Sequence, residues 1–186
     1  MKNDLLTVYS YFSHNFRTCT STIVATIEAL KMELIDVNSD EMKSIYESSF
    51  IMDILDVCLN ICIDHILNLN SKASDYDLNI TNLIKKFVEE QKQLIELSEL
   101  EVEIPEEDFI VNKNSYIIKN LLQIILFEGT KNATHKLKIK IDGKTIFIQL
   151  KDSKDNPNDI FGIFKNIFKQ NGVNFEYNKD EYILEF

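Results

Sequence analysis

The chain is short of the two residues that build tight turns, with 4 glycines and 2 prolines among its 186 residues. So few glycines exclude a glycine-rich phosphate loop, because such a loop needs several glycines to bring backbone amides around a phosphate. Their scarcity favours long helices with short connections. A content of 45% hydrophobic and 27% charged residues is typical of a globular protein with one or two domains.

Other scarcities exclude whole classes of protein. The formal net charge is -10 and no Lys/Arg cluster stands out, which argues against a nucleic-acid partner. No apolar run approaches the roughly 20 residues of a membrane span. The N-terminal residues lack the apolar segment of a signal peptide. The 3 cysteines, an odd number, do not indicate a disulfide framework. We therefore expect a cytoplasmic protein that binds neither nucleic acid nor membrane.

Helical periodicity dominates the first third of the chain. Apolar residues recur every three or four positions from Leu5 to about Ile35, and again from about Glu41 to Leu69. Residues 37–40 form a short turn in which Ser39 or Asp40 can cap the second helix. The two predicted apolar faces comprise Leu5, Tyr9, Phe12, Phe16, Ile23, Ile27, Leu30 and Leu34, and Ile45, Met52, Leu55, Leu59, Ile63 and Ile66. A lone hairpin cannot bury two such faces, so we expect a homodimer built on a four-helix bundle.

The pattern changes after the polar segment 70–77. Helices are expected over about 80–97, 115–128 and 159–170, and strands over 100–104, 136–141, 145–150, 173–177 and 182–186. The dipeptide Asp142-Gly143 between two alternating runs indicates a hairpin. The fold class is therefore α+β, with a helical hairpin in residues 1–72 and a sandwich of helices on one face of a mixed sheet in residues 73–186.

One short segment carries chemistry: Phe12-Ser13-His14-Asn15-Phe16-Arg17-Thr18. It resembles the H-box of bacterial sensor histidine kinases, F-[ST]-H-[ED]-[LF]-R-T-P-L, and lies where that family has it, on the first helix of a long hairpin. The resemblance implies that His14 accepts and donates a phosphoryl group, since neutral imidazole is a nucleophile near neutral pH. It also implies that Arg17 and Thr18 shape the surface on which a receiver domain docks.

Two residues depart from the H-box pattern. Asn15 replaces the acidic residue that acts as a base when ATP is the donor, and an amide cannot accept that proton. We expect Asn15 instead to hydrogen-bond the phosphoryl group. Cys19 replaces the proline, so the bend below the histidine is expected to be weaker. Thr18 matches a position that in the family can orient water for receiver dephosphorylation, although it can equally be a plain surface threonine.

The second domain resembles the ATP-binding domain of the same kinases, without its motifs. Asn120 matches the first asparagine of the N-box, but the second, a Mg²⁺ ligand in the family, falls on Ile124, which cannot ligate a cation. Asp152 follows a strand where the family has D-x-G-x-G, yet the glycines are absent. The later glycine loop is reduced to Gly162. We expect no bound cofactor and no ATP, with Mg²⁺ carried by the partner receiver domain.

Three further residues share one face of the second helix: Cys58, Cys62 and His65. Their spacing could supply three zinc ligands, although buried thiols and a histidine near a bundle end are more often simple core residues. His65 follows Asp64 and is a second candidate for phosphorylation, without the Arg-Thr context. His135 is expected on the surface, just before a strand.

An intact histidine hairpin beside a degenerate ATP domain resembles the dimeric histidine phosphotransferases of phosphorelays. The resemblance implies transfer of a phosphoryl group between His14 and the receiver aspartates of response regulators in two-component signalling. Two alternatives remain open. One is an inactive pseudokinase that acts as a scaffold or inhibitor of a kinase or regulator. The other is a divergent ATP-dependent histidine kinase.

Overall fold

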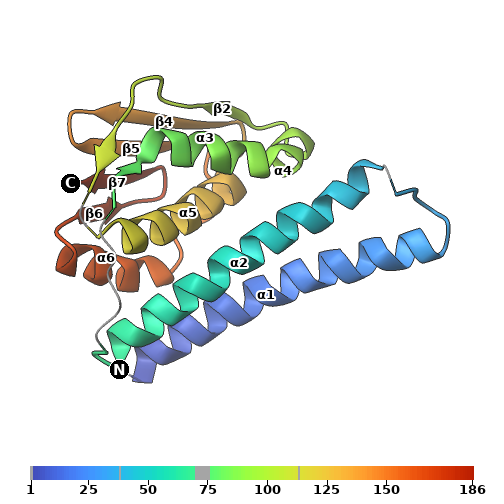
Figure 1. The fold of residues 1–186 in the computed structure, drawn as a ribbon, viewed down its shortest axis with the longest axis horizontal. Coiled ribbons are helices and arrows are strands. Elements are labelled where there is room, and N and C mark those ends of the chain that lie inside the picture. Colours follow the sequence, from blue (N-terminus) through green and yellow to red (C-terminus); the bar gives the residue numbers. More distant parts are fainter. Residues whose placement is uncertain (1, 38, 70–75, 113) are drawn as a thin grey trace.

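The first part of the chain is a hairpin of two antiparallel helices, α1 (Lys2–Lys31) and α2 (Asp40–Ile66), as the periodicity predicts (Figure 1). The computed structural model describes residues 2–37, 39–69, 76–112 and 114–186. The expected cap of α2 is wrong in one respect: Ser39 occupies the N-cap position, but its side chain makes no capping hydrogen bond. The predicted domain boundary between residues 72 and 73 lies outside the described residues.

The second part is a sandwich, called here the sandwich domain, whose described residues begin at Tyr76. Its large sheet has five strands in the order β2-β4-β5-β7-β6, of which only the β2–β4 pair is parallel. The mixed sheet and its covering helices confirm the predicted fold class. The elements are β1 (Leu78–Asn79), α3 (Ile80–Glu90), α4 (Lys92–Leu97), β2 (Glu101–Glu103), β3 (Ile110–Val111), α5 (Ser115–Asn132), β4 (Lys136–Asp142), β5 (Thr145–Lys151), α6 (Ile160–Gln170), β6 (Asn174–Tyr177) and β7 (Glu181–Glu185).

One face of the large sheet is apolar and buried, and the other is partly exposed. Along β5 the side chains alternate, so that Ile146, Ile148 and Leu150 are buried and the residues between them are not. The β4–β5 turn contains Gly143 at a φ of +57°, a conformation that glycine adopts without strain. This turn confirms the hairpin predicted from Asp142-Gly143.

The single helix expected over residues 80–97 is wrong, because the chain breaks at Gln91 into α3 and α4. The side chain of Glu47 on α2 explains the break. Its Oε1 accepts hydrogen bonds from the backbone N–H groups of Gln93 (2.6 Å) and Leu94 (3.4 Å), at the start of α4. A carboxylate at a helix N-terminus satisfies free amides there and stabilises that end. The contact comes from a distant part of the sequence and could not be read from local pattern.

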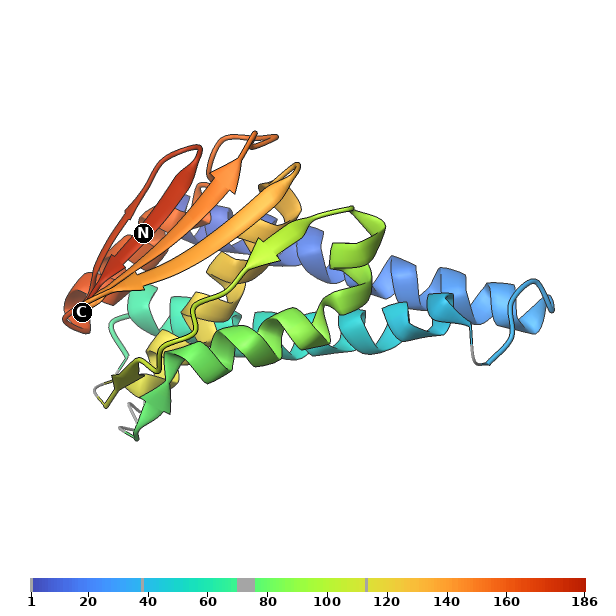
Figure 2. The ribbon, with the colours of Figure 1, turned by 90° about the horizontal axis from the view of Figure 1, so that it is seen from above.

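Helix α5 lies between the sheet and the helical hairpin (Figures 1 and 2). One side packs on the sheet, where a Cβ at the position of Gly129 would contact Leu137, Ile148 and Tyr182. The other side meets α2, where the Cys58 thiol donates to the carbonyl of Asn120 at 3.2 Å. Because both sides are covered, α5 is buried nearly all around. Helix α5 therefore links the hairpin to the sandwich domain through its contacts on both sides.

The predicted apolar face of α1 is largely not the face that packs within the chain. The buried residues are Val8, Tyr11, Phe12, Asn15, Cys19 and Thr26. Of the predicted face only Phe12 is among them, whereas Tyr9 is 70% exposed and Ile27 is 38% exposed. We call Leu5, Tyr9, Ile23 and Ile27, all exposed or half-buried, the outer stripe of α1. Among the described residues, no helix combines the length and apolar character that a membrane span requires.

Candidate functional site

The H-box residues divide between the two sides of α1. Phe12, Asn15 and Cys19 point inward and are 2%, 3% and 6% exposed. His14 and Arg17 lie on the solvent side. Positions three or four apart share a helix face, so burial of the first three leaves His14 beside the buried face, at its exposed edge. The helix thereby presents an exposed imidazole from a firmly packed turn.

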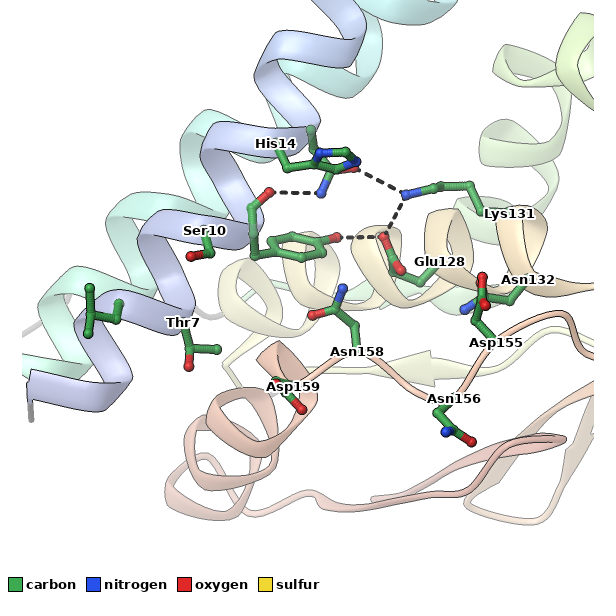
Figure 3. Close-up of a pocket in the computed structure, with 13 residues that line it drawn as sticks. Thr7, Ser10, His14, Glu128, Lys131, Asn132, Asp155, Asn156, Asn158 and Asp159 are labelled. Carbon is green, nitrogen blue, oxygen red and sulfur yellow. Dashed lines mark hydrogen bonds and ion pairs between the residues drawn. The ribbon is translucent and has the colours of Figure 1, made fainter.

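The side chain of His14 lines a polar cavity between α1, α5 and the segment before α6 (Figure 3). The cavity has a volume of about 740 Å³. Its lining residues are Leu6, Thr7, Ser10, Tyr11, His14 and Asn15 from α1, Glu128, Lys131 and Asn132 from α5, and Asp155, Asn156, Asn158 and Asp159 from the segment before α6. The histidine therefore faces the region where the sandwich domain meets the hairpin.

A hydrogen-bonded network joins α1 to α5 directly beneath His14. The Tyr11 hydroxyl donates to Glu128 Oε1 at 2.9 Å. Lys131 Nζ donates to the same oxygen at 3.4 Å and to Asn15 Oδ1 at 3.2 Å, while Asn15 Nδ2 donates to the Tyr11 carbonyl at 2.9 Å. Glu128 is 3% exposed, so its charge is buried, and these donors compensate it. The expected bond from Asn15 to a phosphoryl group stays a prediction.

Burial and the charges of the network shift the pKa values of Tyr11 and Cys19. Burial raises the pKa of Tyr11 well above the ordinary value of 10.0, and the negative charge of Glu128 raises it further. Tyr11 is therefore a neutral hydrogen-bond donor at physiological pH. Burial also raises the pKa of the Cys19 thiol, while the positive charge of Lys131 partly offsets that effect. The positive charge of Lys131 thus acts on Cys19 of α1, which lies five residues after His14.

Thr18 and Arg17 are exposed on the stretch of α1 that follows His14. The Thr18 hydroxyl donates to the His14 carbonyl at 3.1 Å, a bond within the helix that fixes its rotamer. Its oxygen lone pairs stay able to accept a hydrogen bond from water. Both residues lie on the solvent side that also carries the imidazole.

The residues at the positions that match the kinases' nucleotide motifs are ill suited to ATP with Mg²⁺. Ile124 is fully buried in the core, and the Asn120 amide donates to the Tyr116 carbonyl of its own helix at 2.7 Å. Asp152 is exposed at a φ of +55°, and no glycine stands at the motif positions that follow it. Gly162 lies inside α6 rather than in a loop. These positions supply neither the oxygen ligands nor the backbone cradle that a magnesium nucleotide requires.

The cysteine and histidine cluster on α2 is part of the packing. Cys58 and Cys62 are fully buried, and burial raises the pKa of Cys62 to about 12. His65 Nδ1 is instead hydrogen-bonded to Gln170 Oε1 of α6 at 2.9 Å. Within the described ranges, no three His, Cys, Asp or Glu residues form a group suited to a metal ion. His135 is exposed immediately before β4, where the sequence placed it.

Several cavity residues are not predictable from the H-box. Glu128 and Lys131 follow the apolar run of α5, and their spacing of three residues could have indicated a helical ion pair. Nothing local shows that the pair reaches Tyr11 and Asn15, because that contact spans more than a hundred residues. The Asn and Asp residues before α6 have a composition that is typical of any polar loop, so the sequence does not mark them as cavity residues.

No protein-family model matches the sequence, and no curated protein matches it. Solved structures with a similar fold do exist. The cytoplasmic segment of histidine kinase QseC has a TM-score of 0.56 at 12% identity, covering 70% of this chain and 91% of that chain. The Acinetobacter baumannii histidine kinase AdeS has a TM-score of 0.53 at 10% identity, covering 92% of this chain and 94% of that chain. This chain therefore has a histidine-kinase-like fold, a helical hairpin followed by an ATPase-type sandwich.

Proposed function

We propose that this protein is a histidine phosphotransferase, which moves a phosphoryl group between His14 and the receiver aspartate of a response regulator. The observation that carries the proposal is the exposed imidazole of His14 on a packed turn of α1. In the neighbouring sandwich domain, the buried Ile124 stands where the kinases have an asparagine ligand for Mg²⁺. A histidine without a usable nucleotide needs another phosphoryl donor. A receiver aspartyl phosphate is a donor of suitable reactivity, and it brings its own Mg²⁺.

The transfer of the phosphoryl group from aspartate to His14 needs no reactant besides these two side chains and water. The lone pair of a neutral His14 ring nitrogen attacks the phosphorus of the aspartyl phosphate in line. The N–P bond forms as the P–O bond to the aspartate breaks, and the aspartate leaves as a carboxylate. The other ring nitrogen keeps its proton during the attack and then releases it to water. The reverse sequence returns the phosphoryl group to a second receiver.

Receivers approach along the exposed side of α1 that carries His14, Arg17 and Thr18. Arg17 offers a permanent positive charge to an acidic receiver surface. The outer stripe of α1 is proposed to pair with a second copy of the chain in a four-helix bundle. An exposed apolar stripe along α1 would otherwise leave its side chains in water.

Labelling from a receiver tests the proposal. Receiver domains from the same cell are charged with radiolabelled phosphate, purified and mixed with the protein. We expect label on the wild-type chain and none on His14→Ala. The matched control is His135→Ala, which removes another exposed histidine and should keep the label. Equal labelling of His14→Ala and wild type would contradict the proposal.

Two arms of the same experiment separate the alternatives. Label from ATP alone would favour a divergent kinase over a phosphotransferase. A scaffold is the second candidate, favoured by the network that holds hairpin and sandwich domain together through Glu128. A scaffold would bind receivers with equal affinity in wild type and His14→Ala, and neither would be labelled.

A further inference from the structure

Lys131 has a distinctive place in the cavity that His14 lines. Among the described residues of that lining, it is the one with a permanent positive charge, against the carboxylates of Glu128, Asp155 and Asp159. Its side chain is 37% exposed, whereas that of Glu128 is 4% exposed. In Figure 3 the Lys131 side chain extends from α5 toward the turn of α1 that carries His14. The ammonium is therefore placed at the boundary between a buried carboxylate and the open cavity.

The hydrogen bonds of Lys131 leave it able to take a further acceptor. A lysine ammonium has three N–H donors. One is directed to Asn15 Oδ1 at 3.2 Å and one to Glu128 Oε1 at 3.4 Å. The ammonium also lies 5.0 Å from the centroid of the Phe127 ring, a cation–π contact that uses no particular N–H, so the third N–H can be donated to an oxygen in the cavity. Glu128 does not depend on Lys131 alone, because the Tyr11 hydroxyl also donates to it at 2.9 Å.

A phosphoryl group on His14 would enter surroundings that are otherwise acidic. The carboxylates of Asp155 and Asp159 repel a phosphoryl dianion, and the amides and hydroxyls of the lining carry no charge to balance them. A single ammonium offsets one of the two negative charges of a phosphoryl dianion. It cannot compensate the longer polyphosphate of a nucleotide, which matches the loss of the nucleotide motifs in the same domain.

We propose that Lys131 is the phosphoryl-binding residue of the His14 site, donating its third N–H to an oxygen of the group that His14 carries. This inference rests on the proposed function in that it takes His14 as the phosphoryl carrier. The sandwich domain, although it fits no nucleotide, then completes the phosphotransfer site by supplying a cation to the hairpin. Asn15 acts as a positioning residue, since its Oδ1 holds the ammonium beside the histidine.

Potassium phosphoramidate provides a test that needs no receiver. The His14 ring nitrogen attacks its phosphorus, the N–P bond of the reagent breaks, and ammonia leaves and takes up the ring proton. The second-order rate constant is followed by ³¹P NMR, counting only the signal that His14→Ala lacks. We expect Lys131→Gln to lower this rate constant about 10- to 100-fold, the usual effect of losing a hydrogen bond to a charged group. Lys131→Arg, which keeps the charge, should stay within about threefold of wild type.

Two further variants distinguish contact with the phosphoryl group from a structural role. Lys119→Gln removes a lysine from the same helix, well away from the cavity, and should react as wild type does. Glu128→Gln keeps the shape of the network but removes the competing anion, so the rate should rise about two- to fivefold. If Lys131 served only to hold α1 on α5, Glu128→Gln would slow the reaction as Lys131→Gln does.

The outcomes separate this inference from the proposed function. An unchanged rate for Lys131→Gln, a slow Glu128→Gln variant, or no reaction at His14 with phosphoramidate would each overturn the role of Lys131. Labelling by phosphoramidate with the expected order of rates supports it, even where no receiver transfers to His14. If phosphoramidate labels His14 but no phosphorylated receiver does, only the phosphotransferase function is overturned.

Discussion

The Tyr11 hydroxyl donates a 2.9 Å hydrogen bond to Glu128 Oε1, which ties the hairpin to the sandwich domain beneath His14. Both residues are at most 5% exposed. The bond therefore replaces water that neither group can reach, and its loss leaves a buried carboxylate short of one donor. Single substitutions at this contact can therefore weaken the packing of the hairpin against the sandwich domain.

Removal of the Tyr11 hydroxyl should lower stability without altering shape. We expect Tyr11→Phe to reduce the free energy of unfolding by about 1–3 kcal/mol, the cost of an unsatisfied buried group. Urea unfolding followed by circular dichroism measures the difference. Tyr9→Phe is the matched control, because Tyr9 is 70% exposed on the same helix and should change stability by less than about 0.5 kcal/mol. Equal effects of the two variants would contradict the role of the buried bond.

Alkaline pH should weaken the fold through the same tyrosine. The folded-state pKa of Tyr11 is raised above 10.0, by burial first and then by the charge of Glu128. The folded state thus prefers the protonated phenol, so its contribution is fully present below pH 10 and is lost as the pH rises toward the folded pKa. The free energy of unfolding should fall more steeply above about pH 10 in wild type than in Tyr11→Phe. The thiols of Cys58 and Cys62 titrate in both proteins, so parallel curves would refute a contribution from Tyr11.

Restoring the missing asparagine should not restore ATP binding. Ile124 is 0% exposed, and Ile124→Asn would bury an amide in an apolar core. We expect a loss of about 3 kcal/mol or more in the free energy of unfolding, and no heat of binding when Mg-ATP is titrated calorimetrically. Ile124→Val keeps the site apolar and should cost about 1 kcal/mol. Binding of Mg-ATP to folded Ile124→Asn would show that the remaining loops can hold a nucleotide.

Charges on the outer stripe of α1 should separate the proposed dimer. Tyr9→Glu combined with Ile27→Glu places two carboxylates where apolar contacts between copies are expected, and each costs several kcal/mol if buried unpaired. Size-exclusion chromatography with light scattering should show a dimer for wild type and a monomer for the double variant. Leu97→Glu is the control, because Leu97 is 76% exposed on α4, outside the hairpin. A wild-type monomer at micromolar concentration would contradict the dimer.

The elements that could be predicted from the sequence are those set by local pattern. The long periodicity of α1 and α2 and the alternation around Asp142-Gly143 indicate the hairpin and the central strands, because side-chain spacing alone decides which face can be buried. The H-box resemblance likewise predicts the role of His14, and the scarcity of glycine predicts that no phosphate loop forms; both stay predictions. The pair β1 and β3 was not predicted, since strands of two residues each carry no period.

The tertiary structure decided what depends on contacts between distant residues. Helix α4 begins where Glu47 of α2 satisfies its amides, and α1 buries the face of Val8 and Tyr11 instead of the one with the more regular apolar spacing. Periodicity reports that a face is apolar, but not whether this chain or a second copy covers it. The neighbours of His14 depend on the docking of α5, which brings Lys131 to Asn15 across 116 positions of sequence. A charged pair three residues apart on one helix cannot reveal that partner, because only the packing of the two domains places them together.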